Sequence, residues 1–141
     1  MKTISLWQPW AQYIALGHKT IETRHWFHEY RGLIAIHAAK KYVALDSSSI
    51  ATLGVHGIVP LKKTDCPLGA IVAVADLSMV LHSYECAKQC NYNEVNLTLG
   101  DYSAGRYGWI LRNVRALKTP LPWKGAQGWF NVPDELILAR L

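Results

Sequence analysis

The sequence has few charged residues, few cysteines and no long hydrophobic run. Only 18% of its 141 residues are charged and 50% are hydrophobic, so the chain can bury one core without disulfides or metal. Its three cysteines, Cys66, Cys86 and Cys90, form no repeated pair, which argues against a disulfide framework. No apolar stretch of about 18 residues is present, and the N-terminus does not read as a secretory signal. We therefore expect residues 1–141 to form a single cytoplasmic domain that is not associated with membranes. A stable monomer is plausible, and the sequence does not specify the oligomeric state.

One group of potential metal ligands stands out, because His82, Cys86 and Cys90 lie four residues apart. On a helix these side chains would form one stripe and could in principle hold zinc. Structural zinc sites usually have four ligands and a shorter cysteine spacing, however, and no fourth ligand is evident here. We therefore expect two small thiols on a helix, with no metal site and no cofactor.

The net charge of +5 is distributed unevenly along the chain. Residues 46–101 carry three basic and six acidic residues, whereas residues 1–45 and 102–141 each carry six basic and two acidic ones. If the fold brings the two ends together, they would form a basic face, which is the usual footprint of a phosphate-bearing partner. Charge alone thus favours a nucleic acid as the partner, although many soluble domains are equally basic without one.

Local patterns predict a mixture of strands and helices. Pro9 opens a short helix that Gly17 ends, since proline suits the first helical turn and glycine the position after the last. Helices are also expected over residues 46–53 and 84–89 and from residue 133 onward, and strands over residues 2–7, 20–24, 32–38, 69–80, 107–111, 114–117 and 129–132. This pattern predicts an α+β fold, a closed or nearly closed β-barrel with appended helices.

The densest group of charges lies in residues 17–24, which read G-H-K-T-I-E-T-R. If a strand begins at Thr20, alternation places Glu22 and Arg24 side by side on one face. Lys19 lies on the turn before this strand, so its long side chain can fold back over the same face. These three side chains could bind a polar ligand or form an ion-pair cluster among themselves.

Several motifs occur in the same order as in a known family. The pattern G-x-K-x-x-E-x-R at residues 17–24 follows a helix that begins L-W-Q-P-W-A at residues 6–11. Together they resemble the signature of the ASCH domain, a branch of the PUA-like superfamily. Later segments are similar too: Y-R-G-x-I-x-I-H-A-A-K at 30–40, P-L-G-A-I-V at 67–72, G-R-Y-G-W at 105–109 and K-G-x-Q-G at 124–128. The resemblance spans nearly the whole chain except residues 46–66 and 82–104.

The resemblance implies a PUA-like, mostly antiparallel β-barrel with appended short helices, and an association with RNA metabolism. It also implies a basic cleft between the first helix and the barrel, with single-stranded RNA or a modified nucleoside as ligand. Gln8 would read a base edge there, and Trp7 or Trp10 would stack on the base, although packing is the more common role of such a tryptophan. The residues expected to contact the ligand are Gln8, Trp10, Lys19, Glu22, Arg24, Lys40, Arg106, Tyr107, Lys124 and Gln127.

Basic groups are expected to hold the flanking phosphates. Arg24, Arg106 and Lys124 are the candidates, the last of them on a glycine-containing loop that can approach a ligand closely. The helix N-terminus at Pro9 also offers unpaired N–H groups that suit an anion. His37 follows an apolar strand and is expected to be a core histidine.

Catalysis is the alternative to binding. The superfamily includes ribonucleases and amidohydrolases that remove an acyl group from a modified cytidine. In the amidohydrolase branch a threonine stands where this chain has Glu22, so the resemblance does not carry over that nucleophile. A hydrolase would here use Glu22 as general base and Lys19 to stabilise the developing negative charge. Binding is therefore the first interpretation, hydrolysis the second, and a protein-interaction module without an active cleft the third.

Overall fold

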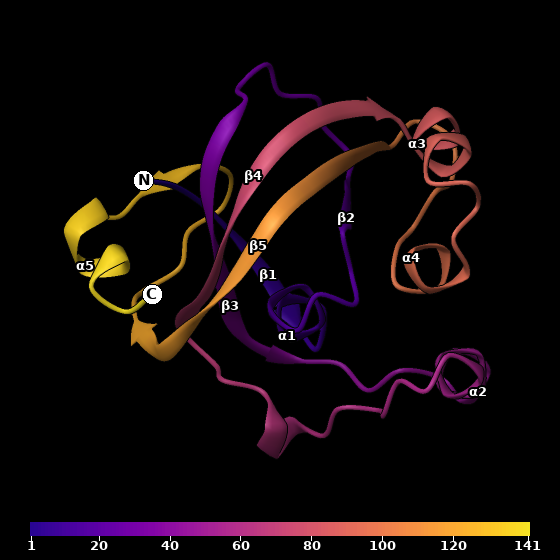
Figure 1. Ribbon diagram of the computed structural model, residues 1–141, viewed down its shortest axis with the longest axis horizontal. Helices are drawn as coiled ribbons and strands as arrows, with labels where there is room; N and C mark the ends of the chain where they lie inside the picture. Colours follow the sequence, from indigo (N-terminus) through magenta and orange to yellow (C-terminus); the bar gives the residue numbers. More distant parts are fainter.

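The computed structural model describes all 141 residues, and one six-stranded sheet runs through it in the order β2-β5-β4-β3-β1-β6 (Figure 1). The strands are β1 (Lys2–Gln8), β2 (Ile21–Arg24), β3 (Gly32–Tyr42), β4 (Ala70–His82), β5 (Tyr107–Pro122) and β6 (Phe130–Asn131). The helices are α1 (Trp10–Ala15), α2 (Ser47–Val55), α3 (Ser83–Gln89), α4 (Glu94–Thr98) and α5 (Asp134–Leu138), with a 3-10 turn at Lys63–Asp65.

The sheet is mixed and open. Strands β1 and β3 pair in parallel, and the four other neighbouring pairs are antiparallel, so the expectation of a mostly antiparallel sheet is correct. The expected closure into a barrel is not seen, because β2 and β6 form the two edges and do not pair with each other. Strand β6 has only two residues, both opposite β1, and offers no length that could bridge to β2.

The long strands curve around α1, which lies on the concave side of the sheet (Figure 1). Ala11 and Ile14 of this helix belong to the largest apolar cluster, together with Ile4, Ile36 and Trp109 from the strands. All five side chains are fully buried, so burial of apolar surface fixes the helix against the sheet. The residues before and after α1 are thereby held over the inner face.

The opposite face of the sheet carries a second apolar cluster. Ile71 and Val74 of β4 pack there with Val132 and with Ile137 of α5. Because β4 is covered on both faces, its first six residues are all buried. This explains why its sequence is a continuous apolar run rather than an alternating one.

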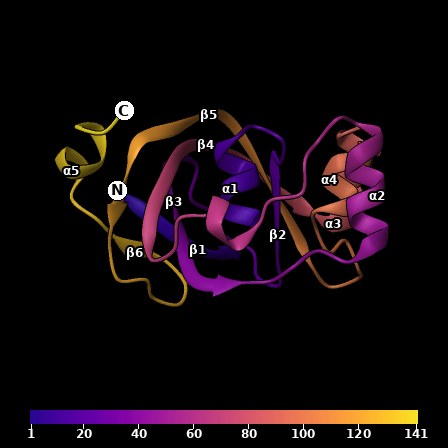
Figure 2. The ribbon, with the colours of Figure 1, turned by 90° about the horizontal axis from the view of Figure 1, so that it is seen from below.

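Helices α2, α3 and α4 gather at one end of the molecule, away from α5 and β6 (Figure 2). Leu53 of α2, Val95 of α4 and Leu99 pack against the buried ring of Tyr13. Asp46 caps α2 as predicted, accepting a hydrogen bond of 2.7 Å from the Ser49 N–H. This third cluster includes Leu99, which directly follows α4, and thereby holds that segment beside β2. None of the helices is long and apolar enough to cross a membrane.

Candidate functional site

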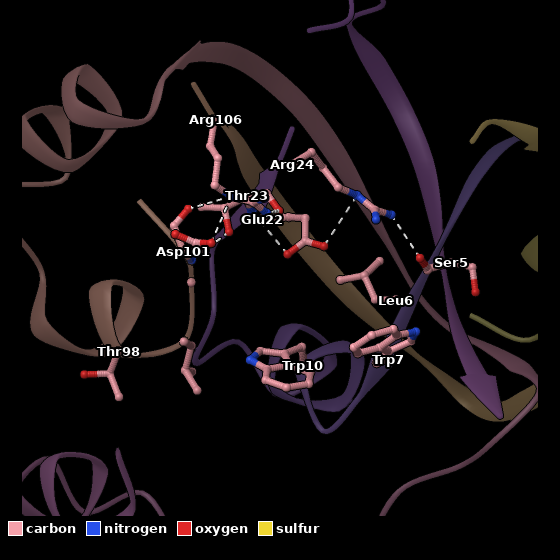
Figure 3. A pocket seen from close by; sticks show the side chains of 12 residues that line it. Ser5, Leu6, Trp7, Trp10, Glu22, Thr23, Arg24, Thr98, Asp101 and Arg106 are labelled. Carbon is pink, nitrogen blue, oxygen red and sulfur yellow. Dashed lines mark hydrogen bonds and ion pairs between the residues drawn. The ribbon is translucent and has the colours of Figure 1, made fainter. Parts of the chain in front are cut away.

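A cavity of about 470 Å³ lies beside β2, and we call it the first cavity. Four segments meet around it: the second half of β1, the start of α1, strand β2, and the loop between α4 and β5 (Figure 3). Its lining residues are Ser5, Leu6, Trp7, Trp10, Glu22, Thr23, Arg24, Thr98, Leu99, Gly100, Asp101 and Arg106. The structure therefore brings part of the charged segment of residues 17–24 together with residues 5–10 and 98–106.

Glu22 is the central acid of this cavity. Its side chain is 11% exposed, and its carboxylate points into the space above the tryptophan rings (Figure 3). One carboxylate oxygen, Oε1, lies 3.5 Å from the Lys19 ammonium, and the other, Oε2, lies 3.6 Å from Nε of Arg24. Oε1 also accepts a hydrogen bond of 3.2 Å from the Thr23 N–H. The carboxylate is thus held between two cations while one edge faces the cavity.

Lys19 lies beneath Glu22 rather than in the cavity wall. Its side chain has no exposed surface, and its Nζ donates to the carbonyl oxygens of Ile21 at 2.6 Å and Leu99 at 2.8 Å. Burial lowers the pKa of Lys19, and the neighbouring carboxylate of Glu22 opposes that effect. With Glu22 the ammonium has three acceptors for its three protons, so it is satisfied within the protein and does not reach a ligand.

Arg24 extends along the cavity wall toward β1. Its Nη2 donates a hydrogen bond of 2.9 Å to the Ser5 carbonyl oxygen, which ties β2 to β1 across the cavity (Figure 3). Its buried Nε makes no hydrogen bond, because the nearest acceptor, Oε2 of Glu22, is 3.6 Å away. The guanidinium therefore retains donor capacity. Its position beside the Glu22 carboxylate agrees with the alternation predicted for residues 20–24.

The loop from Thr98 to Arg106 forms the wall opposite β1. Nη2 of Arg106 donates to the Thr23 carbonyl oxygen at 3.0 Å, and its Nε donates to the Asp101 carbonyl oxygen at 3.0 Å. The Asp101 N–H in turn donates to Oγ1 of Thr23 at 2.9 Å. Hydrogen bonds from Ser103 lower the pKa of Asp101. Arg106 thus lines the cavity as expected, but its guanidinium is used to hold the loop on β2.

Two tryptophans form the aromatic side of the cavity (Figure 3). Trp7 is 51% exposed, and the ammonium of Lys41 lies 3.7 Å from the centre of its ring. Trp10 is half-buried and also packs against the third apolar cluster. Trp10 therefore packs against the core on one side, as expected, and forms part of the cavity wall on the other.

Gln8 does not line the cavity. Its side chain is completely buried, its Nε2 donates to the Pro67 carbonyl oxygen at 2.8 Å, and its Oε1 accepts from the Gln12 N–H at 2.8 Å. The amide is therefore satisfied within the protein and has no atom free to read a base. The same side chain satisfies the Gln12 N–H in the first turn of α1, so this group is not available to the anion that the sequence analysis expected at the helix N-terminus.

The remaining expected ligand contacts lie elsewhere. Lys40, Lys124 and Gln127 line a second cavity of about 810 Å³ on the other side of Ser5, which both cavities share. The ring of Tyr107 packs against Phe27 and His82 and borders neither cavity. The ten expected contacts are thus divided between two cavities, the interior and an aromatic cluster.

His37 is buried as the sequence predicted, and it forms part of the second cavity wall. Its Nε2 lies 2.7 Å from the Trp123 carbonyl oxygen, and its Nδ1 lies 2.8 Å from Oγ of Ser5. Because a carbonyl can only accept, Nε2 carries the proton and Nδ1 accepts from the serine hydroxyl. Burial lowers the pKa of His37, which is consistent with this neutral form.

Sequence reasoning missed the residues of the loop that closes the first cavity. Thr98, Leu99 and Asp101 lie in a segment outside the recognised motifs, and only the acid at position 101 beside Arg106 hinted at an ion pair. No group of three or more His, Cys, Asp or Glu side chains is arranged to hold a metal ion. His82 packs its ring against Tyr107.

Comparisons with known proteins support the motif-based resemblance. The family model of the ASCH domain matches residues 4–134. Similar solved structures include the ASCH protein from Zymomonas mobilis, with a TM-score of 0.59, 14% identity, and coverage of 96% of this chain and 89% of that one. A mutant of that protein gives a TM-score of 0.59, 14% identity, and coverage of 98% and 94%. At this identity the likeness concerns the fold. No curated protein sequence matches the chain.

Proposed function

Because the chain belongs to the ASCH domain family, we propose that its first cavity binds a nucleobase of single-stranded RNA or of a modified nucleoside. The observation that carries this proposal is the composition of the cavity walls. Trp7 and Trp10 offer ring faces on one side, and the carboxylate of Glu22 lies next to the guanidinium of Arg24 on the other. A flat heterocycle with a polar edge matches both walls.

The aromatic wall supplies most of the expected affinity. Stacking of a base on an aromatic side chain is worth about 1–3 kcal/mol and tolerates any base. Trp7 is the better stacking partner because half of its surface is open, whereas Trp10 is held by the packing behind it.

The polar wall supplies the selectivity. The Glu22 carboxylate can only accept, so it favours the amino and ring N–H groups of a base, and Arg24 can only donate, so it favours a ring nitrogen or carbonyl. Lys19 acts as a positioning residue in this proposal, because it holds Oε1 of Glu22 from below without touching the ligand. A base that offers a donor next to an acceptor would satisfy both side chains at once.

Hydrolysis is the second candidate function, and the observation that favours it is the carboxylate of Glu22 facing a solvent-connected cavity. Glu22 would act as general base on water or on a ribose hydroxyl. Lys19, the other member of the expected reactive pair, has all three donors occupied. Lys19 would therefore stabilise the ionised carboxylate of Glu22 and would not contact a developing oxyanion directly.

The binding proposal is tested by titrating the protein with the four ribonucleosides, an acylated cytidine and short single-stranded RNA. We expect Trp7→Ala to weaken the tightest of these interactions by about tenfold or more, the equivalent of one stacking interaction. Tyr84→Ala is the matched control, because Tyr84 is an exposed aromatic residue that lines neither cavity. Equal affinity of the two variants would contradict base binding in the first cavity.

Glu22→Gln separates binding from hydrolysis. The substitution keeps the shape of the side chain but removes the base and adds a donor, so an enzyme would lose its turnover while retaining its ligand. Product formation from the same panel is measured by chromatography after prolonged incubation at high protein concentration. Intact substrates with the unmodified protein would rule out hydrolysis of these compounds and leave the binding proposal in place.

A further inference from the structure

The second cavity differs from the first in its charge. The first cavity is lined by two arginines, Arg24 and Arg106, and by two acids, Glu22 and Asp101. The second is lined by Lys40 and Lys124 and by no acid. Its remaining lining residues include the neutral His37 and the amide of Gln127. The formal charges of the first cavity therefore cancel, and those of the second sum to a positive value.

The cations of the two cavities also differ in their partners. Arg24 lies next to Glu22, and Arg106 lies next to Asp101. Neither Lys40 nor Lys124 takes part in any of the ion pairs of the structure. The arginines of the first cavity are thus already neutralised by neighbouring carboxylates, whereas the lysines of the second are not. The second cavity would therefore attract an anion more strongly.

The backbone around the second cavity is open to a ligand. Residues 124–128 connect β5 to the last strand, and none of their N–H groups makes a hydrogen bond within the protein. Gly125 lies so close to the His37 ring that an added Cβ would stand 2.7 Å from Cε1. On the opposite wall the Lys40 stem lies against Gly69, where an added Cβ would stand 2.9 Å from Cε. These glycines allow the loop, the imidazole and the lysine to come together.

The two cavities are neighbours, because Ser5 of β1 lines both. Its carbonyl oxygen accepts from Arg24 of the first cavity, and its hydroxyl donates to His37 of the second. The two cavities therefore meet at this residue.

We propose that the second cavity binds a phosphate group attached to the nucleoside whose base lies in the first cavity, so that the ligand is an oligonucleotide or nucleotide rather than a free nucleoside. The proposal rests on the proposed function and names the chemical class of its ligand. Lys40, Lys124 and the free N–H groups of residues 124–128 would contact the phosphate oxygens. The neutral first cavity would hold the base and contribute little to binding of the backbone.

If the second cavity holds the phosphate and the first holds the base, loss of the cations of the second cavity should weaken the binding of phosphorylated ligands only. A pair of double variants tests this expectation. Lys40→Gln combined with Lys124→Gln removes both cations of the second cavity, and Lys88→Gln combined with Lys118→Gln removes two lysines that line neither cavity. Both pairs lower the net charge equally, so general electrostatic attraction changes alike. Thermal unfolding establishes that each variant is folded before binding is measured.

The probes are the four ribonucleosides, their 5′- and 3′-monophosphates, the matching RNA tetranucleotides and a tetranucleotide of abasic sugar phosphate. We expect the tetranucleotide or a monophosphate to bind at least about tenfold more tightly than the nucleoside, an advantage that the Lys40/Lys124 variant loses and the Lys88/Lys118 variant keeps. The slope of log affinity against log salt concentration for the tetranucleotide should become shallower by about 0.7 for each phosphate that the variant no longer neutralises. The affinity for the nucleoside itself should not change.

The outcomes distinguish the two proposals. If RNA binds and depends on Trp7 but the two double variants behave alike, the phosphate site is refuted and base binding stands. If the abasic tetranucleotide binds through Lys40 and Lys124 while nucleosides bind nowhere, the phosphate site is supported and base binding in the first cavity is refuted. If a monophosphate matches the tetranucleotide, the ligand is a nucleotide and not a chain. If no probe binds, both proposals are refuted.

Discussion

Lys19 shows how this protein accommodates a charged side chain with no access to water. An isolated ammonium in the interior would lose its hydration and would be strongly disfavoured. Two carbonyl oxygens and one carboxylate replace that hydration, and one of the carbonyls belongs to Leu99, far along the chain. The residue therefore joins β2 to the loop behind α4 while it supports the charge of Glu22.

Replacing Lys19 by methionine is expected to destabilise the protein by about 3 kcal/mol, because removal of the buried ammonium leaves the Glu22 carboxylate with one of its two cations. Two buried carbonyl oxygens would also lose their donor. The free energy of unfolding is measured by urea denaturation. Lys88→Met on α3 is the control and should change stability by less than about 0.5 kcal/mol, since a surface substitution removes no buried partner. Equal stability of the two variants would show that the buried cluster contributes nothing net.

Among the residues of the site, the sequence predicted contacts between neighbours in the chain but not contacts with distant segments. Alternation along a strand correctly placed Glu22 beside Arg24, since it depends only on neighbours in the chain. The burial of Lys19 could not be predicted, because it depends on the carbonyl of Leu99, in a segment without a recognisable pattern. Gln8 illustrates the same limit, since its amide is held by Pro67 after a long excursion of the chain.

At the scale of elements, helix α3 packs closely on β5 at Gly108. A Cβ added to Gly108 of β5 would lie 2.3 Å from Sγ of Cys86 and 2.7 Å from its Cβ. Cys86 is fully buried, and burial raises its pKa to about 11, so it behaves as an inert packing group. Glycine at position 108 is therefore required for α3 to approach the sheet.

Gly108→Ala is expected to lower the free energy of unfolding by about 1–3 kcal/mol, because an added methyl group in a closely packed contact must displace a neighbour. Gly54→Ala is a matched control of the same chemistry within α2, where an added Cβ meets nothing within 4 Å. It should stabilise the protein by about 0.5–1 kcal/mol, as alanine does in a helix interior. Urea denaturation of both variants measures the difference, and a stabilising effect of Gly108→Ala would contradict the packing argument.

The strands were largely predictable and their connections were not. The apolar run of residues 69–80 became β4, and the two strands expected at residues 107–111 and 114–117 are one strand, β5. Asn113 interrupts the alternation with a φ of +50° while the pairing with β4 continues through register shifts. In the sequence, this local irregularity at Asn113 resembles the end of a strand, which is why two strands were expected. Whether a sheet closes into a barrel depends on whether its two edge strands pair with each other. The hydrophobic pattern of the sequence does not show which strands lie at the edges.

At the scale of the whole molecule, His37 connects three distant segments. It lies on β3, opposite Ser5 of β1, and binds the carbonyl oxygen of Trp123 beyond β5. Its lowered pKa means that the folded protein binds this proton less readily than the unfolded chain, where the pKa of histidine is about 6.5. Below that value the unfolded state takes up more protons. The contribution of His37 to stability is therefore complete above about pH 6.5 and is lost as the pH falls.

The free energy of unfolding is accordingly expected to fall between about pH 7 and about pH 5, and His37→Gln should make that fall shallower. His28, whose pKa burial also lowers, adds a dependence of the same sign and remains in the variant. His25→Gln removes an imidazole from an exposed position and serves as the matched control. Parallel pH profiles for the protein and the His37 variant would contradict the assignment.

The free edge of β2 has a consequence for the behaviour of the protein at high concentration. Strand edges present unpaired carbonyl and N–H groups that can recruit a strand from another molecule and begin aggregation. The carbonyl oxygens of Ile21 and Thr23 do not pair with a strand and accept instead from the cationic side chains of Lys19 and Arg106. Lys19, beneath the first cavity, and Arg106, in its wall, therefore also hinder the addition of a further strand to this edge. A substitution at Lys19 or Arg106 would therefore expose part of this strand edge as well as alter the surroundings of the cavity.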